Sequence, residues 1–141
     1  MNISKKGIEL IKRFEGCRLE AYKDIVGVWT IGFGFTKGVK AGDRMTMEEC
    51  ERRLTDELRE YEAGVLQACA VHPNQNQFDA LVCFAWNVGI GGMSQSSVLK
   101  HHNNKDTLNA MKAFALWNKA GGKVVQGLVN RRAAEAALYF N

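Results

Sequence analysis

The sequence of 141 residues lacks low-complexity runs and internal repeats, and it contains a single proline. Disordered tails and linkers are poor in hydrophobic residues and often rich in proline, so this composition excludes a long disordered segment. Hydrophobic residues make up 46% of the chain. At this length they are sufficient to build one core without stabilising disulfides or metals. We therefore expect one folded domain over residues 1–141.

Long hydrophobic runs are also missing. The longest mostly apolar stretch, residues 26–35, has half the length that a transmembrane helix requires and contains three glycines. The first residues, MNISKKGIELIKRFEG, are interrupted by charge too often for a secretory signal. The sequence therefore predicts no membrane span, and we expect the chain to be made in a cytoplasm without a leader.

The sequence has no CxxC motif. Its four cysteines are widely spaced, at Cys17, Cys50, Cys69 and Cys83. This spacing excludes the usual zinc and redox motifs. We expect reduced thiols in a protein made in a cytoplasm, and the even number of cysteines leaves a disulfide open.

Histidine is scarce, and the three histidines, His72, His101 and His102, form no metal-binding pattern with an acidic residue or a cysteine. We expect them to be solvated at helix ends. Neither a phosphate-binding loop nor a nucleophilic serine motif is present. The sequence thus predicts no metal and no cofactor.

The charge of the chain is mildly basic, with 19 lysines and arginines against 15 acidic residues and a net charge of +4. This excess suits an anionic polymer, which could be cell wall or nucleic acid. The basic residues are scattered instead of forming a stripe along one helix, which argues against a nucleic-acid-binding protein.

The first third of the chain predicts a helix followed by a small sheet. Ser4 is a suitable N-cap for a helix that ends at Glu15, next to Gly16. Residues 24–27 are typical of a turn. Residues 28–35 then alternate with period two, which predicts a strand with an aromatic face and a nearly bare face. Thr30 falls on the bare face, together with Val28, Gly32 and Gly34.

The remainder of the chain is predicted to be helical. Residues 46–49, TMEE, form a capping box, and apolar residues follow at helical spacing over about 24 residues. Further helices are predicted over residues 75–89, 97–103, 107–119 and 127–140, with glycine-rich loops at 89–94 and 121–122. We predict an α+β fold with a small α/β lobe (1–45), a connecting helix (46–70), a helical lobe (71–141) and a cleft between the lobes.

Three polar residues near the predicted sheet are candidates for catalysis. Glu15 shares a helical face with Ile8 and Ile11, and partial burial favours the protonated carboxyl that a general acid needs. Taken singly, Glu15 also fits a solvated helix end, Asp24 an ordinary turn and Thr30 an ordinary strand. Together, two carboxyls and a hydroxyl beside a bare sheet face would suit glycoside hydrolysis.

The segments around these residues resemble the signature of the phage-type lysozymes, or endolysins. The matching segments are FEG at 14–16, Asp24, TIGFG at 30–34, PNQ at 73–75, FDAL at 78–81, NVG at 87–89 and GLVNRR at 127–132. Glu15, Asp24 and Thr30 show the family's spacings of nine and six residues. The resemblance covers nearly the whole chain. Phe35 departs from it, because the family usually has histidine there; we expect the activity to survive and the stability or pH profile to differ.

The resemblance implies a lysozyme-like fold and hydrolysis of the β-1,4 bond between N-acetylmuramic acid and N-acetylglucosamine in peptidoglycan. It implies that Glu15 protonates the leaving oxygen. Asp24 would stay ionised and either activate a water or stabilise the oxocarbenium-like transition state. Thr30 would help to position the water. The family is usually assigned inversion of configuration, for which the two carboxyls must be separated far enough to admit a water.

The resemblance also implies substrate contacts at Trp86 and Asn87 and, by a looser alignment, at Thr36 and Ser96. An aromatic face packs well against a sugar ring, and an amide can bind an acetamido group. Trp86 would equally suit a role in the core. Glu135 follows Arg131 and Arg132 by four and three residues, which indicates a structural ion pair on a helix.

Without a leader, an endolysin needs a partner to reach the wall, and the resemblance suggests a holin that permeabilises the inner membrane. We expect a monomer that is made in the host cytoplasm and acts on peptidoglycan in the periplasm. Two other interpretations remain open. A lytic transglycosylase would need Glu15 but not Asp24 and would form an anhydro-sugar, while a cell-wall-binding remnant would have no activity.

Overall fold

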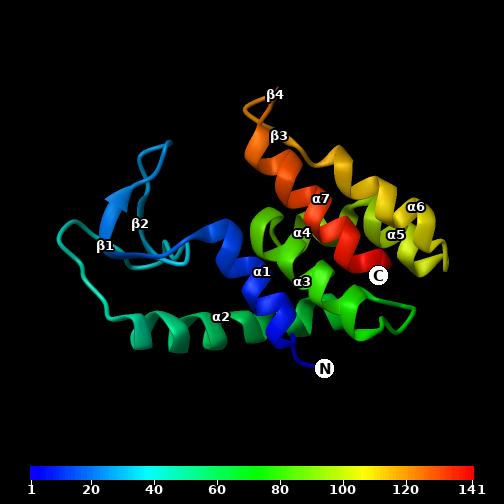
Figure 1. The fold of residues 1–141 in the computed structure, drawn as a ribbon, viewed down its shortest axis with the longest axis horizontal. Coiled ribbons are helices and arrows are strands. Elements are labelled where there is room, and N and C mark those ends of the chain that lie inside the picture. Colours follow the sequence, from blue (N-terminus) through cyan, green and yellow to red (C-terminus); the bar gives the residue numbers. More distant parts are fainter.

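The computed structural model describes all 141 residues and has the predicted α+β fold (Figure 1). The helices are α1 (Lys5–Glu15), α2 (Met47–Ala68), α3 (Gln75–Val88), α4 (Ile90–Gln95), α5 (Ser97–Asn103), α6 (Thr107–Ala113) and α7 (Gln126–Phe140), with a 3₁₀ turn at Phe114–Leu116. The strands are β1 (Arg18–Lys23), β2 (Trp29–Gly32), β3 (Lys119–Ala120) and β4 (Lys123–Val124). Strands β1 and β2 form one antiparallel hairpin, and β3 and β4 form a second.

Helix α1 begins after Ser4 and ends at Glu15, next to Gly16, as predicted. The Ser4 hydroxyl does not cap its own helix; together with the Ser4 N–H it donates to the carboxylate of Asp79 on α3. Gly16 has a φ of 64°, a conformation in which a side chain is strained. The start of α1 is therefore fixed by α3, and its end is fixed by a glycine.

Strand β2 is shorter than predicted. It ends at Gly32, and the chain then reverses so that the backbone groups of Ile31 and Phe35 pair with each other. Gly32 and Gly34 have φ values of 64° and 86°. Alternating glycines in this segment therefore produce a tight turn, whereas the period-two pattern alone had suggested a continuous strand.

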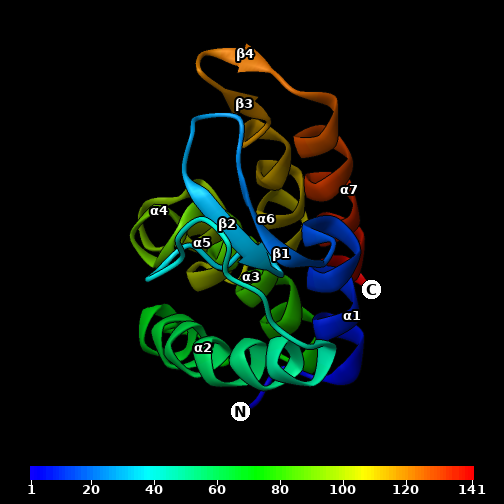
Figure 2. The same ribbon diagram turned by 90° about the vertical axis from the view of Figure 1, so that its left-hand side faces the viewer.

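Helix α2 runs along one side of the molecule from the first hairpin to the helices of the second half (Figures 1 and 2). Its capping box is formed as predicted, with reciprocal hydrogen bonds between Thr46 and Glu49. The buried residues Cys50, Leu54, Leu58 and Val65 recur at helical spacing and face the core. The helix thereby supports both parts of the molecule.

Helix α3 is the centre of the core. It packs against α1, α2, α4 and α7, and its residues 78–85 are all buried. A helix that is apolar on all sides is stable only when other helices surround it. Since α1, α2 and α3 each supply residues to the cleft described below, this packing fixes the relative positions of those residues.

Three local expectations were wrong. The glycine-rich segment predicted as a loop at residues 89–94 forms helix α4, and the helix predicted over 107–119 ends at Ala113 and continues as the 3₁₀ turn. His102 is buried and not solvated, because its ring bonds to the Tyr139 hydroxyl and the Val71 carbonyl. None of the helices combines the length and apolar character needed to cross a bilayer.

Candidate active site

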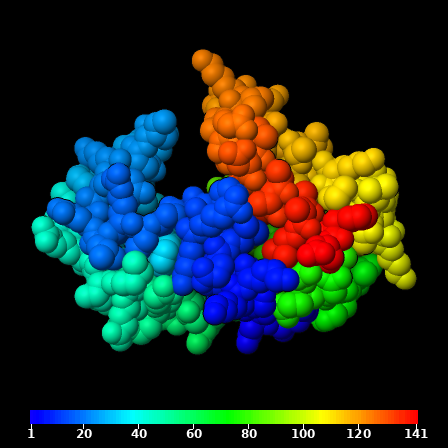
Figure 3. All heavy atoms as spheres, viewed as in Figure 1, coloured from blue at the N-terminus to red at the C-terminus, as the bar shows by residue number.

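A cleft of about 810 Å³ opens between the β1–β2 hairpin and the helices of the second half (Figure 3). It is lined by Glu15, Asp24, Gly34, Thr36, Lys37, Glu57, Glu60, Tyr61, Trp86 and Asn87. These residues come from α1, the first hairpin and its following loop, α2 and α3. Five of the seven residues predicted from the sequence thus meet in one cleft; the exceptions are Thr30 and Ser96.

Glu15 lies at the C-terminal end of α1, where its side chain is 18% exposed. One guanidinium nitrogen of Arg131, Nη1, donates to Glu15 Oε1 at 2.8 Å. The other carboxylate oxygen, Oε2, lies close to Gly34, where a Cβ atom would approach it to 2.6 Å. The carboxyl group is therefore held on one side by a cation and on the other by a backbone that has no side chain.

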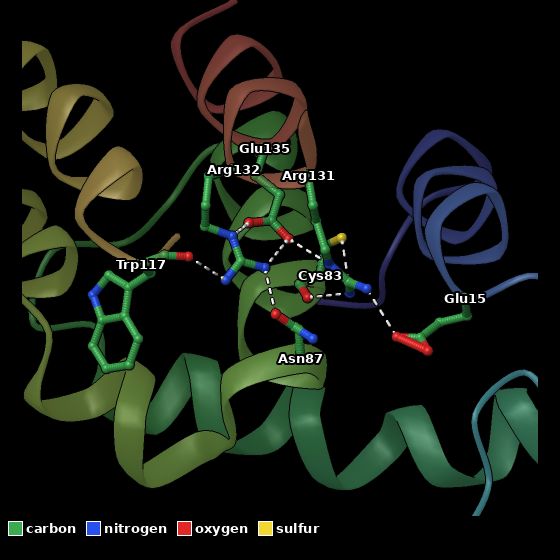
Figure 4. A network of polar contacts seen from close by, with 7 residues as sticks. All are labelled: Glu15, Cys83, Asn87, Trp117, Arg131, Arg132 and Glu135. Carbon is green, nitrogen blue, oxygen red and sulfur yellow. Dashed lines mark hydrogen bonds and ion pairs between the residues drawn. The ribbon is translucent and has the colours of Figure 1, made fainter. Parts of the chain in front are cut away.

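Arg131 belongs to a buried ionic network on α7, which Figure 4 shows in full. Its Nε atom lies 3.1 Å from Oε2 of Glu135, and its Nη2 donates to the carbonyl of Cys83 at 3.0 Å. Arg132 Nε lies 2.7 Å from the other oxygen of Glu135, an ion-pair contact without hydrogen-bond alignment. Glu135 therefore holds both arginines from inside the core.

The charges of this network balance only when Glu15 is included. Arg131 and Arg132 carry two positive charges, and Glu135 supplies one negative charge. Burial raises the pKa of the Glu135 carboxyl, and the charges of Arg132 and Arg131 act against this rise. Buried charges are tolerated when each has a close counter-charge. Once it has given up its proton, the Glu15 carboxylate completes the pairing at the edge of the cleft.

Asn87 connects the same network to the helical wall of the cleft. Arg132 Nη2 donates to its side-chain oxygen Oδ1 at 2.8 Å (Figure 4). Because the oxygen is occupied, the exposed amide can present its two N–H donors to a ligand. The network therefore orients two cleft residues, Glu15 and Asn87, from one buried glutamate.

Trp86 is half-buried and has both of the roles considered from the sequence. Its ring packs against Tyr61 at a centroid distance of 4.9 Å and against Phe35 at 6.4 Å, and it also lines the cleft. Phe35 is fully buried beneath Trp86, with the Arg53 guanidinium 4.6 Å from its ring centroid. The position where the family usually has histidine is thus filled by an aromatic ring in an apolar cluster.

Asp24 lies in the turn between β1 and β2. Its Oδ1 atom accepts the backbone N–H groups of Val26 at 3.0 Å and Val28 at 2.8 Å. Its Oδ2 atom has no hydrogen-bond partner in the protein. The turn and catalytic interpretations are therefore compatible, because one oxygen shapes the turn and the other is free to meet a water or a sugar.

Thr30 does not face an open groove, contrary to expectation. Its side chain is buried, with 4% of the residue exposed, and its hydroxyl donates to the carbonyl of Val28 at 3.0 Å. The same Val28 donates its N–H to Asp24. Thr30 thus contacts the peptide segment that fixes Asp24 and contributes no surface to the cleft.

Two substrate contacts, Thr36 and Ser96, were expected from a looser alignment with the family. Thr36 is exposed and lines the cleft, whereas Ser96 does not line it. Ser96 is buried at the N-terminus of α5, where its hydroxyl accepts the Leu99 N–H and donates to the Met93 carbonyl. The expectation that Ser96 contacts substrate is therefore corrected: it is a helix cap.

Several lining residues were missed from the sequence. Glu57, Glu60 and Tyr61 lie at spacings of three and four residues on α2, so their helical face could have been identified. Arg131 was recognised as a partner of Glu135, but its contact with Glu15 spans 116 residues and had no local signal. No group of three or more potential metal-ligating residues is present.

Comparison with known proteins finds relatives that match nearly the whole chain. The family model described as Phage lysozyme matches residues 12–135. The endolysin of Bacillus phage PZA is 47% identical over 99% of this chain and 55% of its own length. The chain spans about half the length of the first curated relatives it matches.

Solved structures of similar proteins have the same fold. The endolysin from Escherichia coli O157:H7 phage FAHEc1 is 40% identical, with a TM-score of 0.93 over 100% of this chain and 94% of its own. The muramidase domain of SpmX from Asticaccaulis excentricus is 37% identical, with a TM-score of 0.92 over 99% and 98% of the two chains.

Proposed function

Since the chain belongs to the phage lysozyme family, we propose that it hydrolyses the β-1,4 bond between N-acetylmuramic acid and N-acetylglucosamine in bacterial peptidoglycan. The observation that carries this proposal is the Glu15 carboxyl, held by Arg131 in a cleft to which the opposite hairpin supplies a second carboxyl, Asp24. Glycoside hydrolysis requires two carboxyl groups in an open groove, one to give a proton and one to stay ionised.

Glu15 is the proposed general acid. When it gives its proton to the glycosidic oxygen, it becomes a carboxylate 2.8 Å from the Arg131 guanidinium. A cation fixed in advance beside a developing negative charge lowers the energy of the transition state without reorganisation. Arg131 therefore positions the acid and stabilises the charge that remains after proton transfer.

Asp24 is the proposed ionised partner. Two backbone N–H groups hold its Oδ1, and the free Oδ2 is available to activate a water or to stabilise an oxocarbenium-like transition state. An inverting enzyme needs a gap of about 6.5–9.5 Å between the carboxyls, against about 5–5.5 Å for a retaining enzyme. The resemblance to the family favours inversion. Thr30 supports this residue through Val28, whose carbonyl accepts the Thr30 hydroxyl and whose N–H donates to Asp24.

Trp86, Asn87 and Thr36 are the proposed substrate contacts. The ring of Trp86 offers an apolar face for a sugar, and the free amide N–H groups of Asn87 can bind an acetamido carbonyl. Thr36 adds a hydroxyl on the opposite wall. In this proposal, one face of α3 and the loop after β2 bind the glycan.

The relatives named endolysin support a biological setting for this activity. We propose that the enzyme acts without a cofactor as a monomer, lysing the host cell at the end of a phage cycle. On this proposal it is synthesised in the host cytoplasm and reaches the wall in the periplasm through a membrane-permeabilising holin.

The test is mass spectrometry of purified peptidoglycan digested by the wild type and by Glu15→Gln. We expect reducing-end muropeptides from the wild type only. Because the amide oxygen of the substituted side chain can still accept the Arg131 hydrogen bond, this variant should melt close to the wild type, which separates loss of chemistry from loss of fold. Anhydro-sugars would instead identify a transglycosylase, and binding without products would identify a wall-binding remnant.

A further inference from the structure

Two cysteines that are far apart in sequence meet beneath the first hairpin. The Sγ atoms of Cys17 and Cys50 lie 3.9 Å apart, although 33 residues separate them. Cys17 is partly exposed in the short segment between α1 and β1, and Cys50 is buried in the first turn of α2. Neither lines the cleft. The other two cysteines, Cys69 and Cys83, are free thiols elsewhere in the fold.

The surroundings of the pair bring the two thiols together. A Cβ atom at Gly32 would approach Cys50 Sγ to 3.2 Å, so the sulfur is packed against the backbone of β2. The thioether sulfur of Met47 lies 4.0 Å from Cys17 Sγ, so three sulfur atoms gather at this point. On the open side, Cys17 is the one thiol of the pair that a dissolved reagent can reach. One accessible sulfur and one buried sulfur are the arrangement of an attacking and a resolving cysteine.

We propose that Cys17 and Cys50 are a disulfide-forming site, whose oxidation ties the junction between α1 and β1 to the start of α2. Bond formation requires the sulfurs to approach from 3.9 Å to about 2.05 Å. Cys17 follows Gly16 outside any helix or strand, so its backbone is free of regular hydrogen bonding that would oppose this movement. The inference is independent of the proposed hydrolytic activity.

The reaction is a thiol–disulfide exchange with a small disulfide as oxidant. The Cys17 thiolate attacks one sulfur of oxidised glutathione, and a first glutathione leaves as its thiolate. Cys50 then loses its proton and attacks Cys17 Sγ, which breaks the mixed disulfide and releases the second glutathione. The protein has lost two protons and two electrons, and the glutathione disulfide has been reduced to two thiols.

The second step is expected to be the slow one at neutral pH. Burial, the neighbouring Cys17 and the charges of Glu49 and Glu51 raise the pKa of Cys50 to about 11. The thiolate is the nucleophile, so the mixed disulfide at Cys17 should accumulate briefly before the cross-link forms. Once formed, the disulfide is uncharged, so its burial beneath β2 has no electrostatic cost.

Oxidation should stabilise the part of the molecule that carries Asp24. The cross-link encloses both strands of the first hairpin, and closing a loop of this length is expected to raise the melting temperature by about 10 °C. The packing of α1, α2 and β2 already holds the two sulfurs near each other, so the native state needs little adjustment.

The test treats the purified protein with oxidised glutathione, followed by alkylation, intact mass, peptide mapping and thermal melting. The matched variants are Cys17→Ser, Cys50→Ala and Cys69→Ser. We expect the wild type and Cys69→Ser to lose two hydrogens, to give a single cross-linked peptide pair containing residues 17 and 50, and to melt about 10 °C higher. Cys17→Ser should give neither the cross-link nor the stabilisation.

Three results would overturn the proposal: a stable glutathione adduct at Cys17 without a cross-link, a cross-link that involves Cys69 or Cys83, or a Cys17–Cys50 bond without an increase in melting temperature. If Cys50→Ala fails to fold, Cys17→Ser still decides the outcome, because its side chain is partly exposed and serine replaces it with little change in shape.

Discussion

Gly34 limits the position of the proposed catalytic acid, and replacing it with alanine tests that role. A Cβ atom at this position would lie 2.6 Å from Glu15 Oε2. To restore an ordinary contact of 3.4 Å, the carboxyl must move by about 0.8 Å. A misplacement of about 1 Å at a reacting group can reduce the rate about 10²-fold. We therefore expect Gly34→Ala to lower kcat about 10²-fold, with KM changed little, because Trp86 and Asn87 are untouched.

Gly42→Ala is the matched control for the backbone. Gly42 has a φ of 84°, close to the 86° of Gly34, but a Cβ atom there would meet nothing within 4 Å. Both variants should lose about 1 kcal/mol of stability from the positive φ, measured by thermal melting. Only Gly34→Ala should lose the release of reducing ends from purified peptidoglycan. Equal activity of the two variants would refute the proposed link between this glycine and the acid.

Three further predictions follow from the site and the core. Asp24→Asn should lower the hydrolysis rate at least about 10²-fold while melting like the wild type, because its amide oxygen can still accept the hydrogen bonds of the turn; near-normal rates would favour a transglycosylase. Glu135→Gln leaves Arg131 and Arg132 without their buried counter-charge and should cost about 3 kcal/mol in urea unfolding, and an unchanged midpoint would contradict the charge balance described above. Burial raises the pKa of Tyr139 from 10.0 to about 12, so the unfolded chain loses this proton first and stability should fall as pH rises above 10; melting curves of Tyr139→Phe should show a shallower alkaline decline.

Elements with local signals were predicted well from the sequence. Helix α1 ends at Glu15, next to Gly16, and the capping box at residues 46–49 starts α2, because a glycine stop and a capping box act within a few residues of the helix end. The overall α+β class also followed from the order of periodic segments. The family resemblance placed Glu15, Asp24, Trp86 and Asn87, which the fold brings into one cleft.

Features that depend on distant contacts were not predictable in this way. Helix α4 forms in a glycine-rich segment because its one fully buried residue, Met93, packs into the core. His102 is buried because Tyr139 and Val71 supply partners from far along the chain. Thr30 alternates correctly with its neighbours, but the turn at residues 32–34 removes the open face on which it was expected. In each case tertiary packing outweighs the local pattern.

The separation between Glu15 and Arg131 affects when the proposed active site becomes complete during synthesis. A ribosome that adds about 5–20 residues per second needs roughly 6–23 s to add the 116 residues from one to the other. Throughout that interval the emerging chain contains its acid, but the acid lacks its guanidinium, and Asn87 lacks the Arg132 contact that orients it. Only docking of α7 supplies both. A growing chain therefore carries no assembled cleft, and the proposed hydrolysis should begin only once α7 has packed onto the core.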